Sequence, residues 1–85
     1  MKELKDTLEM MTSPDYNDHF LAEYYQLDTR IQKLECILRD WDAGILKFDP
    51  TCPRATYDLQ LEYMKKYRAV LEMRAKMEDI DITEV

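Results

Sequence analysis

One apolar strip constrains this chain more than any other feature of its sequence. Between residues 13 and 43, apolar side chains recur at steps of 4, 3, 4, 3, 4 and 3. They are Phe20, Tyr24, Leu27, Ile31, Leu34, Leu38 and Trp41. This spacing puts one apolar side chain per turn on one side of an α-helix, in the a/d pattern of helices that lie along a partner. With Ser13 as a suitable N-cap and Pro14 suited to the first turn, the sequence predicts a helix over 13–43.

A second apolar strip predicts a second helix, over 53–79. Its members are Tyr57, Leu61, Met64, Tyr67, Leu71 and Ala75. The loop expected between the helices, 44–52, begins with Gly44, the only glycine of the chain and suited to the left-handed position after a helix. A short connection between two helices of similar length predicts that they run antiparallel. The expected fold class is therefore all-α, an antiparallel, coiled-coil-like two-helix hairpin over 13–80.

Three flanking segments complete the expected organisation. Residues 1–12 predict a short N-terminal helix, through Leu4, Leu8 and Met11, that docks on the long helix or on a neighbouring subunit. The apolar part of the loop is expected to fold over the open end of the hairpin near Trp41. Its members are Ile45, Leu46 and Phe48. Residues 81–85 are expected to be a flexible tail.

Two helices form a strip of contacts rather than a core, and apolar residues remain off the main strips. These residues are Leu21, Tyr25, Tyr63 and Val70. Exposed apolar surface of this kind is what association between subunits buries, so we expect a homo-oligomer whose interface contains them, forming a multi-helix bundle.

Composition bounds the kinds of partner. The chain has 85 residues and a net charge of −6, which argues against non-specific binding to nucleic acid or to an anionic membrane. No run approaches the roughly 20 apolar residues that cross a bilayer, and no signal-peptide pattern begins the chain. Cys36 and Cys52 are most simply reduced thiols of a cytosol, so we expect a cytoplasmic protein. A redox switch at Cys52, beside the start of a helix, is the less favoured alternative.

No pattern of catalytic residues appears. The sole histidine, His19, has Asp15, Asp18 and Glu23 nearby, yet a metal site needs several convergent ligands, and a solvated histidine is the simpler interpretation. A chain with one glycine has no Gly-rich phosphate loop. We therefore expect no enzyme activity, no metal site and no cofactor.

One arrangement of cations and tyrosines suggests a ligand site. Counting outward from the loop brings the middle of the second helix to the level of the middle of the first. The hypothesised ligand-binding residues are Arg30, Lys33, Lys65, Arg68, Tyr67 and Tyr63. Arginine forks and tyrosine rings commonly hold a phosphate and stack on a base. The alternative is that Arg30 and Arg68 pass beside the apolar strip and pair with Asp28, Glu62 or Glu72, and that the tyrosines only pack.

The order of residues in both helices resembles a family of small helical-hairpin proteins encoded by crAss-like phages and by prophages of gut bacteria. The matching residues of the first helix are Asp15, Tyr16, Phe20, Glu23, Tyr24, Leu27, Arg30, Lys33 and Leu34. Those of the second are Leu59, Gln60, Met64, Tyr67, Leu71 and Arg74. The resemblance covers most of residues 15–75, and His19 departs from it where the family typically has a basic residue. The resemblance implies no particular activity. Small phage hairpins of similar shape include oligomeric proteins that sequester cyclic-nucleotide or cyclic ADP-ribose immune signals.

Three functions remain open. The favoured one is a non-enzymatic phage or prophage accessory protein that counters a host defence by sequestering a phosphorylated nucleotide signal between subunits. The second is an acidic inhibitor that binds a host effector protein, in the manner of an anti-CRISPR protein, because the long helix carries an excess of acidic residues. The third is a structural or assembly helper with no ligand.

Overall fold

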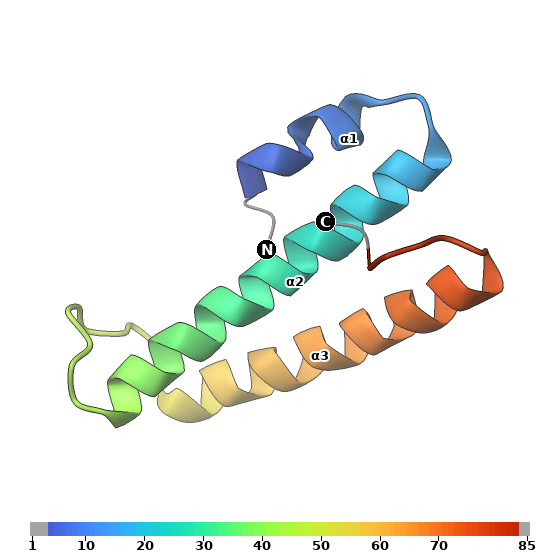
Figure 1. The fold of residues 1–85 in the computed structure, drawn as a ribbon. Coiled ribbons are helices and arrows are strands. Elements are labelled where there is room, and N and C mark those ends of the chain that lie inside the picture. The colour runs from blue at the N-terminus through green and yellow to red at the C-terminus, as the bar shows by residue number, and fades with distance from the viewer. Residues whose placement is uncertain (1–3, 84–85) are drawn as a thin grey trace.

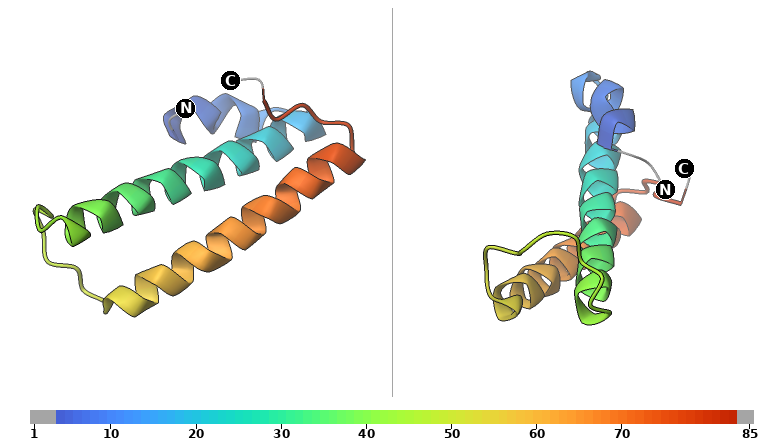
Figure 2. Two further views of the ribbon diagram at one scale, coloured as in Figure 1. Left: turned by 60° about the horizontal axis from the view of Figure 1, so that its bottom comes forward. Right: turned by 90° about the vertical axis from the view of Figure 1, so that its left-hand side faces the viewer.

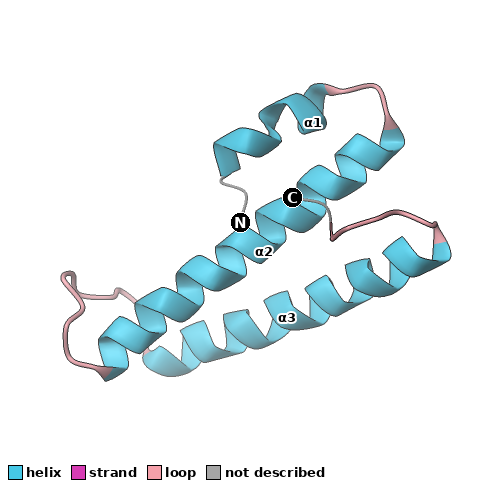
Figure 3. Ribbon diagram, in the orientation of Figure 1, coloured by secondary structure: helices cyan, strands magenta, loops and turns pink. Residues whose placement is uncertain are grey.

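The structure is a computed structural model that describes residues 4–83. A 3₁₀ helix η1 (Leu4–Thr7) leads directly into α1 (Leu8–Thr12), and two long helices follow, α2 (Tyr16–Asp42) and α3 (Arg54–Met77). Figure 1 shows α2 and α3 running antiparallel, with α1 along the other side of α2. The described residues are helical or loop throughout (Figure 3). The predicted all-α hairpin with a short N-terminal helix is confirmed.

The start of α2 differs from the expected one. The helix begins at Tyr16, and its N-cap is Asp15, whose carboxylate accepts a hydrogen bond from the Asn17 amide at 2.9 Å. Ser13, the expected cap, instead accepts a hydrogen bond from the Asp15 amide at 3.1 Å. Both residue types cap helices, but a carboxylate also gains from the positive end of the helix dipole. Asp15 therefore holds the cap, and Ser13 braces the turn before it.

Both long helices end in a Schellman motif. At the end of α2, the Ile45 amide donates to the Asp40 carbonyl at 3.0 Å, and Gly44 has φ +73°, as predicted for the only glycine. At the end of α3, the Ile80 amide donates to the Ala75 carbonyl at 2.8 Å, and Asp79 has φ +56°. After this second turn the chain folds back over the hairpin. Ile80 is therefore buried against the core, and it does not continue the helix.

The core lies between α2 and α3, toward the end of the hairpin that holds the termini. Its buried members are Phe20, Leu27, Ile31, Leu71, Ala75 and Ile80. Leu21, Tyr24, Leu61, Met64 and Ile82 pack around them, so the start of the segment after α3 also joins the core. The two views of Figure 2 show the long helices crossing at an angle and separating toward the loop that joins them.

The N-terminal segment covers a second side of α2, as predicted, but only in part with the predicted side chains. Thr7 is fully buried, and its hydroxyl accepts a hydrogen bond from Gln26 Nε2 at 2.9 Å. The face of α2 beside it carries buried Ala22, Tyr25 and Thr29. Of the three residues expected to dock, Leu4 is half-buried and Leu8 is exposed, while Met11 is about half exposed and its sulfur accepts a hydrogen bond from Gln26 Nε2 at 2.6 Å. Gln26 therefore holds this segment through both Thr7 and Met11.

The loop between the long helices does not cover the end of the hairpin. Ile45 and Phe48 are both more than half exposed, so the expectation that they fold over Trp41 is wrong for these two residues, while Leu46 is half-buried. Trp41 instead packs edge-on against Tyr57, with ring centroids 6.0 Å apart. The Schellman turn after Asp42 leads the chain into the loop, which extends beyond the ends of the two long helices (Figure 1).

Candidate functional site

A row of acidic side chains on α2 faces a row of basic side chains on α3. The pairs are Asp28 with Arg68, Glu35 with Lys65, and Asp42 with Arg54. The carboxylates are seven residues apart, which returns each to nearly the same side of the helix. The Arg68 pair spans 2.8 Å and the Lys65 pair 3.0 Å between nitrogen and oxygen. The long helices are thus joined along one edge by ion pairs rather than by apolar contacts.

The same edge carries further residues, all of them polar except Leu61, at matched steps of 4, 3, 4 and 3 on both helices. We call it the polar edge. It consists of Asp28, Gln32, Glu35, Arg39 and Asp42 on α2, and Arg54, Asp58, Leu61, Lys65 and Arg68 on α3. Gln32 donates to the Asp28 carboxylate at 2.8 Å, so neighbours within the row also bind one another.

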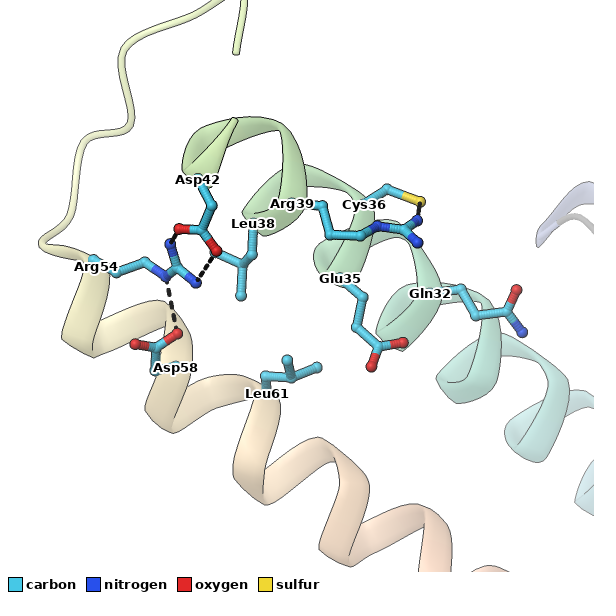
Figure 4. Close-up of a pocket in the computed structure, with 9 residues that line it drawn as sticks. All are labelled: Gln32, Glu35, Cys36, Leu38, Arg39, Asp42, Arg54, Asp58 and Leu61. Carbon is cyan, nitrogen blue, oxygen red and sulfur yellow. Dashed lines mark hydrogen bonds and ion pairs between the residues drawn. The ribbon is translucent and has the colours of Figure 1, made fainter. Parts of the chain in front are cut away.

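A cleft of ≈ 520 Å³ opens in the polar edge where the helices separate. Its lining comprises Gln32, Glu35, Cys36, Leu38, Arg39 and Asp42 on α2, and Arg54, Asp58 and Leu61 on α3. Figure 4 shows Leu38, Asp42, Arg54 and Leu61 at the gap between the two helices, and Arg39 extended along α2 toward Cys36. A volume of about 300–1,000 Å³ is typical of small-molecule sites. The lining mixes cations, carboxylates and an amide with only two leucines, so the cleft suits a polar ligand.

Arg54 is fixed at the loop end of the cleft. Its guanidinium binds Asp42 and donates to the Asp58 carboxylate at 2.9 Å (Figure 4). It also lies 5.5 Å from the centroid of the Trp41 ring. The hydrogen bond from Arg54 lowers the pKa of the Asp42 carboxyl, and the two carboxylates raise the pKa of Arg54. With two carboxylates on one guanidinium, Arg54 is neutralised within the fold and serves mainly to hold the helices together.

Arg39 is the cation of the cleft that the fold leaves unneutralised. Its guanidinium donates to the Cys36 thiol at 2.9 Å and forms no ion pair among residues 4–83. A thiol is a weak hydrogen-bond acceptor, whereas a carboxylate would form an ion pair with the guanidinium. Arg39 is therefore available to an anionic group that enters the cleft.

The structure does not bring the six sequence-predicted ligand residues to one place within a single chain. Lys65 and Arg68 lie together on the polar edge, and the pairing of Arg68 with Asp28 is the alternative that the sequence left open. Arg30 and Lys33 lie about 140° and 160° around α2 from Glu35, on another face. Both are exposed and form no ion pair within the described part of the chain.

The two tyrosines of that set occupy a third face. Tyr63 and Tyr67 are exposed on α3, and the Lys66 ammonium lies 5.2 Å from the centroid of the Tyr63 ring. Of the expected interface residues, Tyr63 and Val70 are exposed on this face. Tyr25 is buried within the chain and Leu21 packs beside the core, so the fold of a single chain already covers much of both side chains.

A second polar cluster closes the end of the hairpin that holds the termini. The Tyr16 hydroxyl donates to the Glu78 carboxylate at 2.5 Å and accepts from Arg74 at 2.9 Å, and Arg74 also lies 5.1 Å from the centroid of the Phe20 ring. The hydrogen bond from Tyr16 lowers the pKa of Glu78 and raises that of Tyr16 itself. The cluster links the start of α2 to the end of α3, so it stabilises that end of the hairpin.

Residues 4–83 contain no cluster of three or more potential metal ligands, and none of their helices is long and apolar enough to span a membrane. His19 is exposed, as expected of a solvated side chain, and both cysteines are exposed thiols. The described residues thus offer the polar edge and its cleft as the candidate site.

Sequence reasoning missed Arg39 and Arg54, although a signal for them was present. The steps of 4, 3, 4 and 3 along Asp28–Asp42 and again along Arg54–Arg68 mark one polar face on each helix. Acidic residues dominate the first row and basic residues the second, and such rows attract each other when the helices run antiparallel.

Fold and cleft together define a small helical-hairpin protein with a polar cleft between its two long helices. The chain belongs to the Sequestin family, whose family model matches residues 14–77, from the turn before α2 to the last residue of α3. The name of the family suggests a protein that binds and sequesters a signal, so membership implies binding rather than a known enzymatic activity. No curated protein and no solved structure matches the chain.

Proposed function

We propose that this protein sequesters a phosphorylated nucleotide that serves as an immune signal, and that it does so on behalf of a phage or prophage in the cytoplasm of a bacterial host. Membership of the Sequestin family supports sequestration as the activity. The observation that carries the choice of ligand is Arg39, a cation without a carboxylate partner in a cleft whose other cation, Arg54, is neutralised.

The chemistry of the cleft suits both parts of a nucleotide. The Arg39 guanidinium can bind a phosphate through two parallel hydrogen bonds. Glu35 and Asp58, both on the lining, can accept hydrogen bonds from ribose hydroxyls. Lys65 is bound to Glu35, which lines the cleft, so it can move from that carboxylate to a second phosphate. A ligand with hydroxyls between phosphates, such as a cyclic oligonucleotide or a cyclic ADP-ribose, matches this order of charges.

The other sequence-predicted ligand residues contribute only if subunits associate. Arg30, Lys33, Tyr63 and Tyr67 lie on other faces of the same chain, so they reach a ligand in the cleft only from a second copy. The proposal thus has an inner part, Arg39 with Lys65, and an outer part that a partner supplies.

Isothermal titration against cyclic dinucleotides, cyclic trinucleotides and cyclic ADP-ribose isomers tests the proposal. We expect heat of binding with at least one of these classes, and uniformly absent heat would refute it. Arg39→Gln should weaken binding at least about tenfold, the cost of a lost charge-assisted hydrogen bond. Arg30→Gln is the matched control, because it is also an unpaired arginine on α2 but lies on another face.

The variants also separate the two parts of the site. Loss of binding in Arg39→Gln alone places the ligand in the cleft of one chain. Loss in both variants indicates a pocket completed by a second copy. Unchanged binding in Arg39→Gln would refute the cleft as the site, even if a ligand were found.

A further inference from the structure

An exposed apolar stripe runs along the side of α3 that turns away from α2. Its members are Leu59, Tyr63, Val70, Met73 and Met77, whose exposed fractions run from 46% for Val70 to 81% for Met77. Lys66 lies between Tyr63 and Val70 on the same side of the helix, and with it the stripe has steps of 4, 3, 4, 3 and 4. That is the a/d spacing of a coiled-coil contact, sustained over about 27 Å of helix. We call these six residues the outer stripe.

The outer stripe is separate from the contact that α3 makes within the chain. The inward side of α3 carries Leu61, Met64, Arg68, Leu71 and Ala75, again at steps of 3 and 4, and its Leu71 and Ala75 are buried against α2. A helix with two such strips is suited to lie between two partners. Figure 1 shows that α2 has this position, with α1 on one side and α3 on the other. Within the described chain, α3 has a partner on its inward side alone.

We propose that the outer stripe pairs with the outer stripe of a second copy, antiparallel, about a twofold axis that passes near residues 68 and 69. The members of the stripe lie symmetrically about position 68. Such a pairing therefore sets Leu59 against Met77, Tyr63 against Met73, and Lys66 against Val70. Each contact then occurs twice, as a closed twofold dimer requires.

Charges beside the outer stripe favour this direction of pairing. Glu62 and Lys76 flank the stripe on the same side, 14 residues apart, and the antiparallel register brings Glu62 of one copy against Lys76 of the other, twice. Lys76 has no ion pair within residues 4–83, and Glu62 has one, with Lys66 at 3.9 Å. A parallel register would instead place the two Lys66 ammonium groups together in the middle of the contact. The flanking charges thus select a second copy in one orientation.

The dimer leaves the candidate ligand site open. The α3 members of the polar edge, such as Asp58 and Lys65, lie about 100° and 120° around the helix from the centre of the outer stripe. The two clefts of a dimer therefore remain accessible, and a copy paired through the outer stripe adds no residue to either, so this dimer is not the contact that would bring Tyr63 to a ligand. This inference does not rest on the proposed function, because a dimer without any ligand satisfies it.

Cysteine crosslinking tests the register. In the full chain with Cys36→Ser and Cys52→Ser, a single cysteine is placed by Ala69→Cys or, as the matched control, by Ala55→Cys. Both alanines are exposed on α3 and 14 residues apart, so they share one side of the helix. The two copies of residue 69 meet at the axis, whereas those of residue 55 lie about 39 Å apart. A short bis-maleimide should link the Ala69→Cys chains and leave the Ala55→Cys chains single. Equal crosslinking of both, or of neither, would overturn the register.

Mass measurement tests the interface without crosslinks. Sedimentation equilibrium should give the wild-type chain a mass of two copies, and Val70→Glu a single-copy mass with unchanged helical circular dichroism. Ala55→Glu, beyond the end of the stripe, should stay dimeric. A wild-type chain that is single at its highest soluble concentration, or a Val70→Glu chain that still dimerises, would overturn the proposal.

A charge exchange tests the flanking pairs. Lys76→Glu should raise the dissociation constant of the dimer roughly tenfold, because two attractive contacts become repulsive. Adding Glu62→Lys to the same chain should restore it to near the wild-type value. Absence of this restoration, with both chains folded, would exclude the antiparallel pairing of Glu62 with Lys76.

Discussion

The rotation of α3 about its own axis can be tested with two neighbouring residues. Leu71 is 0% exposed in the core, and Val70, one residue earlier, is 46% exposed on the outer stripe. Leu71→Ala removes three carbon atoms from contact with the core. At about 0.8 kcal/mol per carbon, the transfer cost is about 2.4 kcal/mol, and the cavity left behind raises the expected total to about 3–4 kcal/mol.

That loss is large for a chain of 85 residues. Domains of this size have total stabilities of about 4–13 kcal/mol, so Leu71→Ala should lower the unfolding temperature by more than about 12 °C. Val70→Ala should change the free energy of unfolding by less than about 0.5 kcal/mol, because alanine is the better helix former and the lost contacts are few.

Urea unfolding, followed by circular dichroism at the lowest measurable protein concentration, compares the two variants. Dilution keeps any self-association from adding to the apparent stability. The m value, which is the dependence of the free energy of unfolding on urea concentration, should be the same in both variants, since each leaves the fold intact. Similar losses in the two variants, or a larger loss in Val70→Ala, would show that α3 presents a different side to α2 and would refute the assignment of core and outer stripe.

Three further predictions concern the ends of the helices and ionisation. Asp79→Gly should raise the free energy of unfolding by about 0.5–1 kcal/mol, because glycine adopts φ +56° without a Cβ clash; an unchanged or lower melting temperature would contradict it. Burial and the hydrogen bond to Glu72 raise the pKa of Tyr24 to about 12, so its contribution is complete below about pH 10 and is lost as the pH rises. Tyr24→Phe should therefore reduce the alkaline loss of stability in pH-dependent urea unfolding, and an identical alkaline profile would count against it. The hydrogen bond from Tyr16 lowers the pKa of Glu78 below 4.5, so its contribution is present above that pH and is lost in acid; Glu78→Gln should flatten the acid limb of the same profile.

The hairpin was predictable because each of its elements carries its own local signal. The strip from Phe20 to Trp41 indicates a helix, and Gly44 indicates where that helix ends. Packing against a partner adds to these signals and does not oppose them. The N-cap was harder to assign, since Ser13 and Asp15 are both good caps and only the chain direction after Pro14 decides between them.

Side chains outside the two strips were predicted less well, for physical reasons. The apolar residues Leu8, Ile45 and Phe48 carry no information about which surface they meet, and all three are exposed. Thr7 anchors the N-terminal segment through a hydrogen bond to Gln26, and nothing local distinguishes that threonine from a surface one.

The candidate site was predictable in part. Sequence spacing shows which residues share a side of one helix, but the rotation of α3 relative to α2 decides which sides meet. That rotation places Lys65 and Arg68 on the polar edge and leaves Arg30 and Lys33 on another face of α2. Acidic residues recur every seven positions on α2, at Asp28, Glu35 and Asp42. Arg39 could have been found from this repeat, because it lies between its last two members.

The position of α2 between α1 and α3 has a consequence for local opening. Seven residues of α2 are buried, from Phe20 to Leu38, against two of α3. Separating α3 from α2 therefore exposes less of the chain than global unfolding does, and the N-terminal segment can keep its hold on α2 meanwhile. Backbone amides of α3 should therefore exchange with deuterated solvent before those around Ile31. In such a local opening, α3 moves away while α2 stays folded and protected.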